Sequence, residues 1–303
     1  MNIEKDIEQF SSNFNININF NYSLKSLNWF NIGGKTKVFF KAETLNDLSK
    51  FMRFFGNKIN FFILGAGSNI LVKDSGFDGV AIKLGKSFSN ISLLNDETII
   101  AGSAALDHKV SNFAKDNDIG GLEFLSCIPG SIGGGIHMNS GCYGTEFKDI
   151  LLSVQAIDTN GNILTIPAST INFEYRKNNL AKDLIFLSAS LKGHKKGKKD
   201  VEKKINFLRE KKSLTQPSQI KTGGSTFKNP KNQTQKKVWE LINEIIPKNK
   251  IFGDAAISDK HSNFFVNKKN ATYGQMKKLI DYVRSEIEKE TGIKLDLEIE
   301  IIG

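Results

Sequence analysis

Cysteine and histidine are scarce in this 303-residue chain, which contains two cysteines and four histidines. Two cysteines are too few for a disulfide framework, so we expect a protein of the reducing cytoplasm. Cys127 and Cys142 lie in a glycine-rich region without the spacing of metal ligands, and the histidines are scattered along the chain. We therefore expect no metal site.

Long apolar runs are absent as well. No uninterrupted apolar stretch approaches the roughly 18 residues that span a bilayer. The first residues, Met1–Asp6, lack the apolar core of a secretory signal. The composition, 39% hydrophobic and 24% charged, is typical of a soluble globular protein. The length fits two or three domains, and we expect no insertion into a membrane.

Acidic residues are outnumbered, which gives a formal net charge of +10. Much of the excess lies in residues 192–212, where ten Lys or Arg accompany three Asp or Glu. Few aromatic residues are interleaved and no nucleic-acid motif is present, so a solvated basic connector or helix face is favoured over a nucleic-acid tract. Local attraction for an anionic, phosphate-bearing ligand is the alternative. We expect no nucleic-acid partner.

Glycine, by contrast, is abundant and clustered. The first cluster, Gly65-Ala66-Gly67-Ser68-Asn69, directly follows the apolar residues 61–64. Glycines at such a junction allow successive backbone N–H groups to converge on a phosphate. Because Ile70-Leu71-Val72 returns at once to strand-like residues, a dinucleotide fingerprint that opens a long helix is disfavoured. Taken alone, this cluster could equally be a structural turn.

The second cluster covers Gly120–Gly144 and alternates glycine with single apolar and small polar residues. A flexible linker would be polar and would lack the isoleucine, leucine and methionine found here. Glycine within an apolar segment instead indicates that the backbone approaches a ligand closely. The two clusters lie about 65 residues apart and together predict a long cofactor with two phosphates between them.

The third cluster is the octapeptide Gly223-Gly224-Ser225-Thr226-Phe227-Lys228-Asn229-Pro230. Its two glycines permit backbone angles that a Cβ would forbid, and its proline ends any strand or helix. Such a run suits a rigid turn that presents the Ser225 hydroxyl to a small ligand. An ordinary Gly/Ser turn explains the octapeptide equally well when it is considered alone.

Local signals predict the principal helices and strands. Thr44 with Asp47, and Thr272 with Gln275, resemble capping boxes ahead of amphipathic helices. Asn160-Gly161 between two apolar segments predicts a hairpin. Further helices are expected at about 106–114 and 237–246, and strands at 38–40, 61–64, 80–84, 98–100, 184–187, 263–266 and 295–303.

Eight segments occur in an order that resembles one known family. They read NWFNIGG, ILGAGSNILV, IPGSIGGGIHMNSGCYG, FEYR, TQP, GGSTFKNP, KHSNFFVN and LDLEIEIIG. From about Leu27 to Gly303 the chain resembles the family of UDP-N-acetylenolpyruvoylglucosamine reductases, also called UDP-N-acetylmuramate dehydrogenases. One such block would be weak evidence, whereas all of them in this order are highly specific.

This resemblance implies an α+β fold, with an FAD-binding module of the vanillyl-alcohol-oxidase (PCMH) type in two subdomains and a C-terminal α+β substrate domain. It implies FAD as cofactor, NADPH as hydride donor, a UDP-sugar substrate and a monomer. The expected divisions are an N-terminal docking extension at 1–27, an FAD-binding domain at 28–195, a basic connector at 196–212 and a substrate domain at 213–303. The residues that match family FAD contacts are Gly65, Ala66, Gly67, Ser68, Asn69, Ser131, Ile132, Gly133, Gly134, Asn139 and Gly141.

The resemblance also implies three catalytic residues. Ser225 matches the proton donor, Arg176 matches the arginine that polarises the substrate carboxylate, and Glu298 matches an acid that stabilises or relays protons around the enol intermediate. A guanidinium suits a carboxylate because it donates two parallel hydrogen bonds and keeps its charge. Without the resemblance, Arg176 would be interpreted as a surface cation and Glu298 as a solvent-facing acid.

Five residues are candidates for substrate binding: Lys212, Lys228, Asn229, His261 and Asn263. A structural role for His261 is an equal alternative. The chain departs from the family pattern at Glu300, where a basic residue is common, and at the Ile245–Lys248 loop. Only 48 residues separate Arg176 from Ser225, which favours the shorter subtype of the family without the tyrosine-bearing insertion.

Two other functions remain open from the sequence. Another FAD-dependent oxidoreductase of the same fold, acting on a sugar or an alcohol, would explain the glycine clusters but not the combination of Arg176, Ser225 and Glu298. A basic binding protein without enzymatic activity is favoured only by the net charge.

Overall fold

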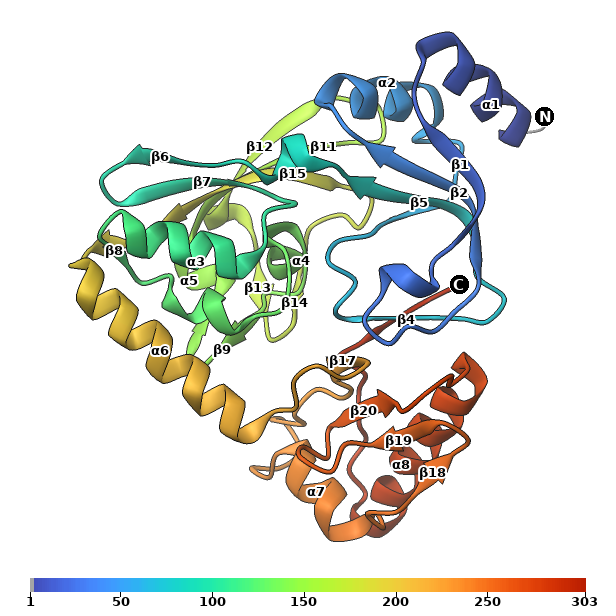
Figure 1. Ribbon diagram of the computed structural model, residues 1–303, viewed down its shortest axis with the longest axis vertical. Helices are drawn as coiled ribbons and strands as arrows, with labels where there is room; N and C mark the ends of the chain where they lie inside the picture. The colour runs from blue at the N-terminus through green and yellow to red at the C-terminus, as the bar shows by residue number, and fades with distance from the viewer. Residues whose placement is uncertain (1–2) are drawn as a thin grey trace. The chain divides into compact units, whose positions relative to one another are not determined.

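The computed structural model describes residues 3–303. The chain divides into two compact units, and each is assembled from segments that are far apart in the sequence (Figure 1). Unit 1 comprises residues 3–20, 38–66 and 79–212. Unit 2 comprises residues 21–37, 67–78 and 213–303.

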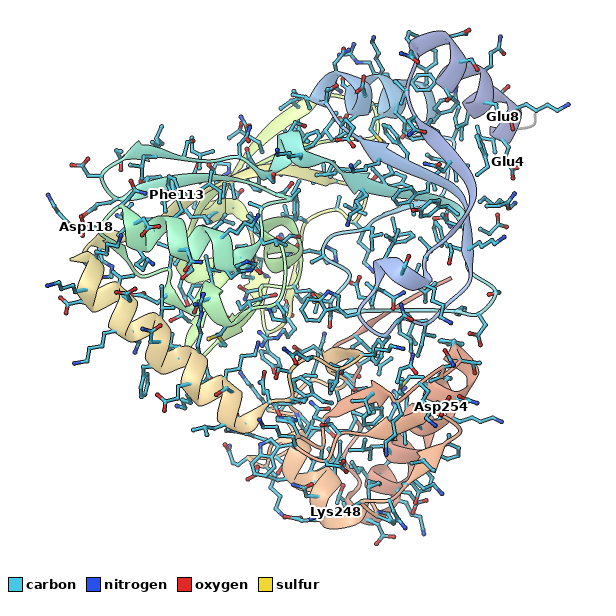
Figure 2. The ribbon with its side chains drawn as sticks, viewed as in Figure 1. Glu4, Glu8, Phe113, Asp118, Lys248 and Asp254 are labelled. Carbon is cyan, nitrogen blue, oxygen red and sulfur yellow. The ribbon has the colours of Figure 1, made fainter. Side chains whose placement is uncertain are left out.

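One core of unit 1 forms where two helices pack on a sheet. The sheet has the order β1 (Ile18–Ser23), β2 (Lys35–Ala42), β5 (Phe77–Leu84), β3 (Phe61–Ile63), and the helices are α1 (Ile3–Phe14) and α2 (Leu45–Phe55). Phe10 of α1 packs edge-on against Phe51 of α2, with ring centroids 5.8 Å apart. On α1, Glu8 is exposed, whereas Ile7 and Phe10 are buried (Figure 2). Helix α1 was not among the predicted elements, since residues 1–27 were expected to be a short docking extension.

The helix α2 begins at the predicted residue, and the Thr44 half of the expected capping box is present. The Thr44 hydroxyl accepts a hydrogen bond from the backbone N–H of Asp47 at 3.1 Å. Leu48, Phe51 and Met52 are fully buried along one face, which is the consequence of apolar residues at helical spacing.

A second core of unit 1 lies against a five-stranded antiparallel sheet. Its order is β12 (Ile163–Pro167), β11 (Leu151–Ile157), β15 (Ile185–Lys192), β7 (Thr98–Gly102), β6 (Ile91–Asn95). The hairpin predicted around Asn160-Gly161 is confirmed, because β11 pairs with β12 from Ser153 to Ile157. The helices α3 (Asp107–Asp116) and α4 (Ile132–His137) contribute Val110 and Ile136 to this core.

Unit 2 is built on a smaller sheet with two helices. The sheet has the order β17 (Thr222–Ser225), β20 (Phe264–Asn267), β19 (Ala255–Ile257), β18 (Ile251–Phe252), and the helices are α7 (Val238–Ile245) and α8 (Tyr273–Thr291). The capping box of Thr272 with Gln275 is confirmed at the start of α8. Gly292 ends that helix with a φ of 71°, a left-handed conformation that glycine adopts at low cost.

The end of the chain pairs with a segment from its first third. Strand β21 (Glu300–Ile302) runs parallel to β4 (Ile70–Val72), with Glu300 opposite Ile70. The strand expected over 295–303 is therefore shorter than the alternation suggested, although an isolated bridge joins Leu297 to Phe227. Both segments belong to unit 2.

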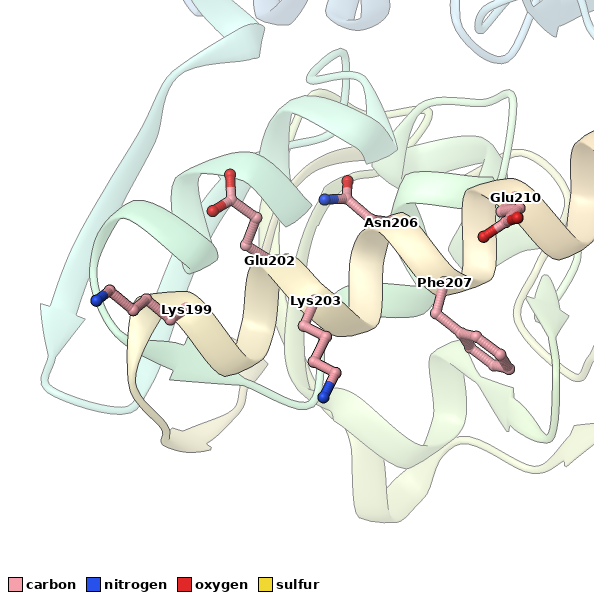
Figure 3. A pocket seen from close by; sticks show the side chains of 6 residues that line it. All are labelled: Lys199, Glu202, Lys203, Asn206, Phe207 and Glu210. Atoms are coloured by element: carbon pink, nitrogen blue, oxygen red, sulfur yellow. The ribbon is translucent and has the colours of Figure 1, made fainter.

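Most of the basic run at 192–212 forms a helix, α6 (Lys198–Thr215). Val201, Ile205 and Leu208 are buried along one side. Other residues of the helix line a shallow surface hollow (Figure 3), namely Lys199, Glu202, Lys203, Asn206, Phe207 and Glu210. The hollow contains none of the residues expected to bind a cofactor or substrate.

The remaining elements are short. They are η1 (Lys25–Leu27), η2 (Lys86–Ser89), β8 (Ile119–Gly120), η3 (Glu123–Cys127), β9 (Gly141–Cys142), β10 (Thr145–Glu146), α5 (Phe147–Ile150), η4 (Ala168–Thr170), β13 (Phe173–Glu174), β14 (Lys177–Asn178) and β16 (His194–Lys195).

Candidate active site

Gly65 of the first glycine cluster and Ser131 of the second, both expected to contact the cofactor, lie close together in unit 1. A Cβ placed on Gly65 would lie 3.1 Å from the Oγ of Ser131, and a Cβ on Gly134 would lie 3.7 Å from the same oxygen. Ser131 precedes α4 and makes no side-chain cap hydrogen bond to it. The Ser131 hydroxyl is thus flanked by two residues without side chains, which leaves the backbone accessible to a bulky anion.

Two amides of the second cluster shape this loop and already have partners. The N–H of Ile132 donates to the carbonyl of Ala105 at 3.0 Å, and the N–H of Gly133 donates to the carbonyl of Ser103 at 2.9 Å. A backbone N–H donates one hydrogen bond at full strength. Ile132 and Gly133 therefore anchor the loop to the turn between β7 and α3.

A lysine that the sequence did not single out lies at the first cluster. The Nζ of Lys83, on β5, donates to the carbonyl of Gly65 at 2.8 Å. Burial, and to a lesser extent the charge of Lys41, lowers the pKa of Lys83. The sequence did contain an indication of this role, because Lys83 lies within the apolar segment Val80–Leu84. A charged side chain in such a segment is costly to bury unless it has a partner.

Asn139 and Gly141, both expected to contact the cofactor, also hold Arg176. The guanidinium of Arg176 donates to the carbonyl of Asn139 at 3.3 Å and to the carbonyl of Gly141 at 3.2 Å. The amide of Asn139 is fully buried and donates to Glu146 and to the carbonyl of Glu174. A Cβ on Gly141 would lie 2.4 Å from the carbonyl oxygen of Thr145, so glycine is required at this position.

Arg176 occupies a strained turn. It lies between the paired strands β13 and β14 with a φ of 58°, a left-handed conformation that costs a residue with a Cβ about 1 kcal/mol. Its side chain is mostly buried, and Glu146 lies 3.9 Å from the guanidinium. The ring of Tyr175 is 4.9 Å from the Arg176 Cζ. These contacts fix the orientation of a permanent positive charge.

Ser225 ends β17, opposite Phe264 of β20. Gly224 precedes it with a φ of 77°, and a Cβ on Gly223 would lie 2.3 Å from the ring of Phe30. Both glycines are therefore required: Gly224 for its backbone angle, and Gly223 for its close packing against the buried Phe30. Ser225 itself is half-buried.

Asn263 clamps the octapeptide just after Ser225. Its side-chain oxygen accepts from the N–H of Phe227 at 3.0 Å, and its side-chain nitrogen donates to the carbonyl of Phe227 at 2.8 Å. Its own carbonyl accepts from the N–H of Thr226 at 2.8 Å. Asn263 is buried, and these bonds give it the role of a clamp on the backbone.

Glu298 joins the same hydrogen-bonded network in unit 2. Its N–H donates to the carbonyl of Thr226 at 2.9 Å. Its carbonyl accepts from the side-chain amide of Asn69 at 3.0 Å. Ser225 and Glu298 thus belong to adjoining backbone segments of unit 2, whereas Arg176 belongs to unit 1.

The other substrate candidates have varied surroundings. Lys228 donates its backbone N–H to the carbonyl of Asp296 at 2.9 Å. The side-chain oxygen of Asn229 accepts from the N–H of Val238, at the start of α7, at 3.1 Å. The Nδ1 of His261 accepts from the N–H of Asn263 at 3.3 Å. Burial lowers the pKa of His261, which favours the neutral imidazole at pH 7.

Lys212 lies on α6 in unit 1. Its Nζ donates to the carbonyl of Cys127 at 2.7 Å. Burial lowers the pKa of Lys212, because desolvation penalises the charged ammonium. A lysine placed in this way reaches the region of the second glycine cluster, which contains Cys127.

A buried acid also escaped the sequence analysis. The carboxyl oxygens of Asp107 and the hydroxyl of Ser111 are buried without a hydrogen-bond partner among residues 3–303. The side chain of Asp107 packs behind Gly130, and burial raises its pKa well above the ordinary value. Within the same residues, no group of three or more His, Cys, Asp or Glu side chains could hold a metal ion.

Comparison with known protein families identifies two regions of the chain. Residues 36–167 match the FAD binding domain, and residues 216–302 match the C-terminal domain of UDP-N-acetylenolpyruvoylglucosamine reductase. The chain is 58% identical to the UDP-N-acetylenolpyruvoylglucosamine reductase of Pelagibacter ubique over 302 residues, which covers all of both chains. The chain belongs to the UDP-N-acetylenolpyruvoylglucosamine reductase family.

More distant members of this reductase family also match the chain over nearly its full length. The enzyme of Rickettsia bellii is 44% identical over 93% of this chain and 92% of its own length. The crystal structure of the reductase from Thermus caldophilus superposes with a TM-score of 0.81 at 27% identity, over 95% of this chain and 99% of that one. The chain is therefore an FAD-containing oxidoreductase with the α+β fold that the sequence implied. No helix in residues 3–303 is long and apolar enough to cross a membrane.

Proposed function

We propose that this protein reduces the enolpyruvyl ether of UDP-N-acetylglucosamine to UDP-N-acetylmuramate, with NADPH as the reductant. The observation that carries this proposal is the match to named reductases over the full length of the chain. The product is a precursor of bacterial peptidoglycan, so we extend the proposal to roles in cell-wall synthesis, cell shape and cell division. We also propose that the protein acts as a monomer in the cytoplasm.

The residues of unit 1 fit an FAD diphosphate. The side-chain-free surfaces of Gly65 and Gly134 flank the Ser131 hydroxyl, and this arrangement leaves space and a donor for phosphate oxygens. Lys83 adds positive charge at the first glycine cluster, which favours an anion through local attraction. Lys212, beside Cys127 of the second cluster, keeps its proposed role in binding the substrate. When bound, FAD supplies from its N5 the hydride that NADPH has provided.

Arg176 binds the carboxylate of the substrate in this proposal. Hydride addition at the methylene carbon places negative charge on the adjacent carbon and on the carboxylate. A guanidinium already held by the carbonyls of Asn139 and Gly141 needs little reorganisation to stabilise that charge. The backbone strain at Arg176 is consistent with a residue that function has selected.

Ser225 donates the proton that completes the reduction. A serine hydroxyl is a weak acid, so it protonates a carbanion only where neighbouring donors stabilise the alkoxide that remains. The backbone around Gly224 is open on the side where a Cβ would stand, and Lys228 lies three residues after Ser225. We propose that Lys228 and the exposed backbone amides are these donors.

Glu298 stabilises the enol or relays protons to it. Its backbone is fixed on both sides by Thr226 and Asn69, which gives a carboxylate the defined position that proton transfer requires. Asn229, His261 and Asn263 support the substrate region, and the clamp made by Asn263 suggests that it acts by positioning the octapeptide.

Purified protein provides the test. Oxidised-flavin absorbance in the purified protein distinguishes a flavoenzyme from a basic binding protein. NADPH consumption that depends on the enolpyruvyl sugar nucleotide supports the proposed reaction. If FAD is bound but the enolpyruvyl substrate does not reoxidise the reduced flavin, and a sugar or an alcohol instead reduces the oxidised flavin, the alternative oxidoreductase is correct.

A further inference from the structure

The backbone of Glu298 is attached to two different parts of unit 2. On one side its N–H donates to the carbonyl of Thr226, next to Ser225. On the other side its carbonyl accepts from the Nδ2 of Asn69, the last residue of the first glycine cluster. Glu298 thus lies between the segment of the proposed proton donor and a loop of the proposed flavin site.

Asn69 contacts the C-terminal segment twice. Its carbonyl accepts from the N–H of Glu300 at 2.9 Å, and its side chain donates to the carbonyl of Glu298 at 3.0 Å. The residues that follow continue this contact, because β4 pairs in parallel with β21 from Ile70 opposite Glu300 onward. The Asn69 amide therefore extends the pairing beyond the end of the ladder, to the residue that carries the proposed acid.

The other end of this loop is also held firmly. The carbonyl of Gly67 accepts from the N–H of Trp29 at 2.9 Å. Gly67 has a φ of 71°, and a Cβ on it would lie 2.1 Å from the carbonyl oxygen of Leu27. Because Gly67 is fixed and Asn69 is bonded to Glu298, a change in the conformation of residues 68 and 69 moves the backbone of Glu298.

We propose that Asn69 is a positioning residue that couples the conformation of the flavin-binding loop to the placement of Glu298. When the cofactor orders this loop, Asn69 positions Glu298 for the second half of the reaction, in which the substrate is reduced. The side chain must donate for this role, since the atom it contacts is a carbonyl oxygen. The inference rests on the proposed function for the role of Glu298.

Two variants remove the donor in different ways. Asn69→Leu keeps the branched shape without an N–H group, and Asn69→Ala removes the side chain beyond Cβ. Asn232→Ala is the matched control, because Asn232 is an exposed residue of the same unit. Each holoenzyme is examined by stopped-flow absorbance in two steps, flavin reduction by NADPH and flavin reoxidation by the enolpyruvyl substrate.

With FAD supplied in excess, because Asn69 also matches a family FAD contact, we expect both Asn69 variants to be reduced by NADPH at a rate within about twofold of the parent, since no proton transfer to carbon occurs in that step. Reoxidation by substrate should slow by about fivefold to tenfold, the effect of one lost neutral hydrogen bond. Equal slowing of both steps in the FAD-saturated variants, or no slowing of reoxidation, would overturn the proposal.

A double variant separates positioning from a structural effect. If Asn69 acts through Glu298, Asn69→Leu combined with Glu298→Gln should reoxidise no more slowly than Glu298→Gln alone. Multiplication of the two defects would contradict the coupling. Glu298→Gln by itself tests the proposed function: if it reoxidises at the parental rate, the role assigned to Glu298 fails, independently of Asn69.

Hydrogen exchange provides a readout that does not depend on turnover. Amides of the peptide that covers 297–302 should exchange more slowly in the FAD-bound parent than after FAD removal. In Asn69→Leu, FAD should no longer protect this peptide, whereas Asn232→Ala should behave as the parent does. An unchanged response to FAD in Asn69→Leu would show that the loop does not reach Glu298 through this side chain.

Discussion

Glu298 and Thr226 share a backbone hydrogen bond of 2.9 Å. Thr226 immediately follows the proposed proton donor, Ser225, and Glu298 is the proposed acid near the end of the chain. The bridge between Phe227 and Leu297 continues the same pairing. Two residues with assigned roles in proton transfer therefore lie on paired segments, and a displacement of one segment displaces the other.

Replacing Ser225 tests the proton donor. In Ser225→Ala, flavin reduction by NADPH should remain within about twofold of the parent, while reoxidation by substrate should slow by about two to four orders of magnitude, the range of general acid catalysis. Stopped-flow measurement of both steps checks this, with the exposed Ser218→Ala as control. Similar losses in both steps would indicate a structural role for Ser225.

Replacing Arg176 tests the carboxylate partner. Arg176→Met should slow reoxidation by about 10²- to 10³-fold, as for other losses of a group that stabilises transition-state charge. Arg176→Lys should fall between Met and the parent, because an ammonium keeps the charge but loses the two parallel hydrogen bonds. Reoxidation is measured against substrate concentration, with the exposed Lys182→Met as control. If Lys and Met are equally impaired, geometry outweighs charge, and if neither is impaired the assignment is wrong.

Replacing Asn263 tests the clamp on the octapeptide. Asn263→Ala leaves the buried N–H and carbonyl of Phe227 without their side-chain partners. The free energy of unfolding should fall by about 2–3 kcal/mol, because each unsatisfied buried group costs about 1–3 kcal/mol. Denaturant unfolding of the holoprotein measures this, and the exposed Asn270→Ala should change little. A loss no larger than that of the control would mean that water replaces the clamp.

Replacing Asp107 tests a buried acid whose pKa is raised by burial. Where the folded pKa exceeds the unfolded value, the folded state binds more protons, so stability falls as the pH rises above about 4 toward the folded pKa. Asp107→Asn cannot ionise and should remove this loss. Its melting temperature relative to the parent should therefore increase from pH 5 to pH 8. The exposed Asp96→Asn should show no such trend, and a parallel response of the two variants would contradict the prediction.

Features that depend on neighbours in sequence were the predictable ones. The cap at Thr44 and the capping box at Thr272 involve residues three positions apart, and both form as the sequence indicates. The hairpin around Asn160-Gly161 is equally local. Helix α1 was not predicted, because the prediction for this segment relied on the alternating apolar residues from Phe14 onward. The helix forms because Ile7 and Phe10, at helical spacing, are buried on one face.

In the proposed site, the sequence motifs predicted which residues matter but not which atoms they contact. The sequence identified Asn139, Gly141 and Asn69 as residues near a cofactor, but it could not indicate which polar atom each would contact. In the structure Asn139 and Gly141 hold Arg176, and Asn69 holds the backbone of Glu298. Lys83 escaped attention altogether, because its partner is a carbonyl 18 residues away rather than a side chain in a motif.

The sequence by itself determined the family, the FAD chemistry and the local elements, because these depend on residue types in a fixed order and on contacts between near neighbours. Only the tertiary structure decided which donors meet which acceptors. The carbonyl of Glu298 meets an amide 229 residues away. Such a pair forms because the parallel pairing of β4 with β21 brings the two segments together, and no local propensity in either segment encodes that register.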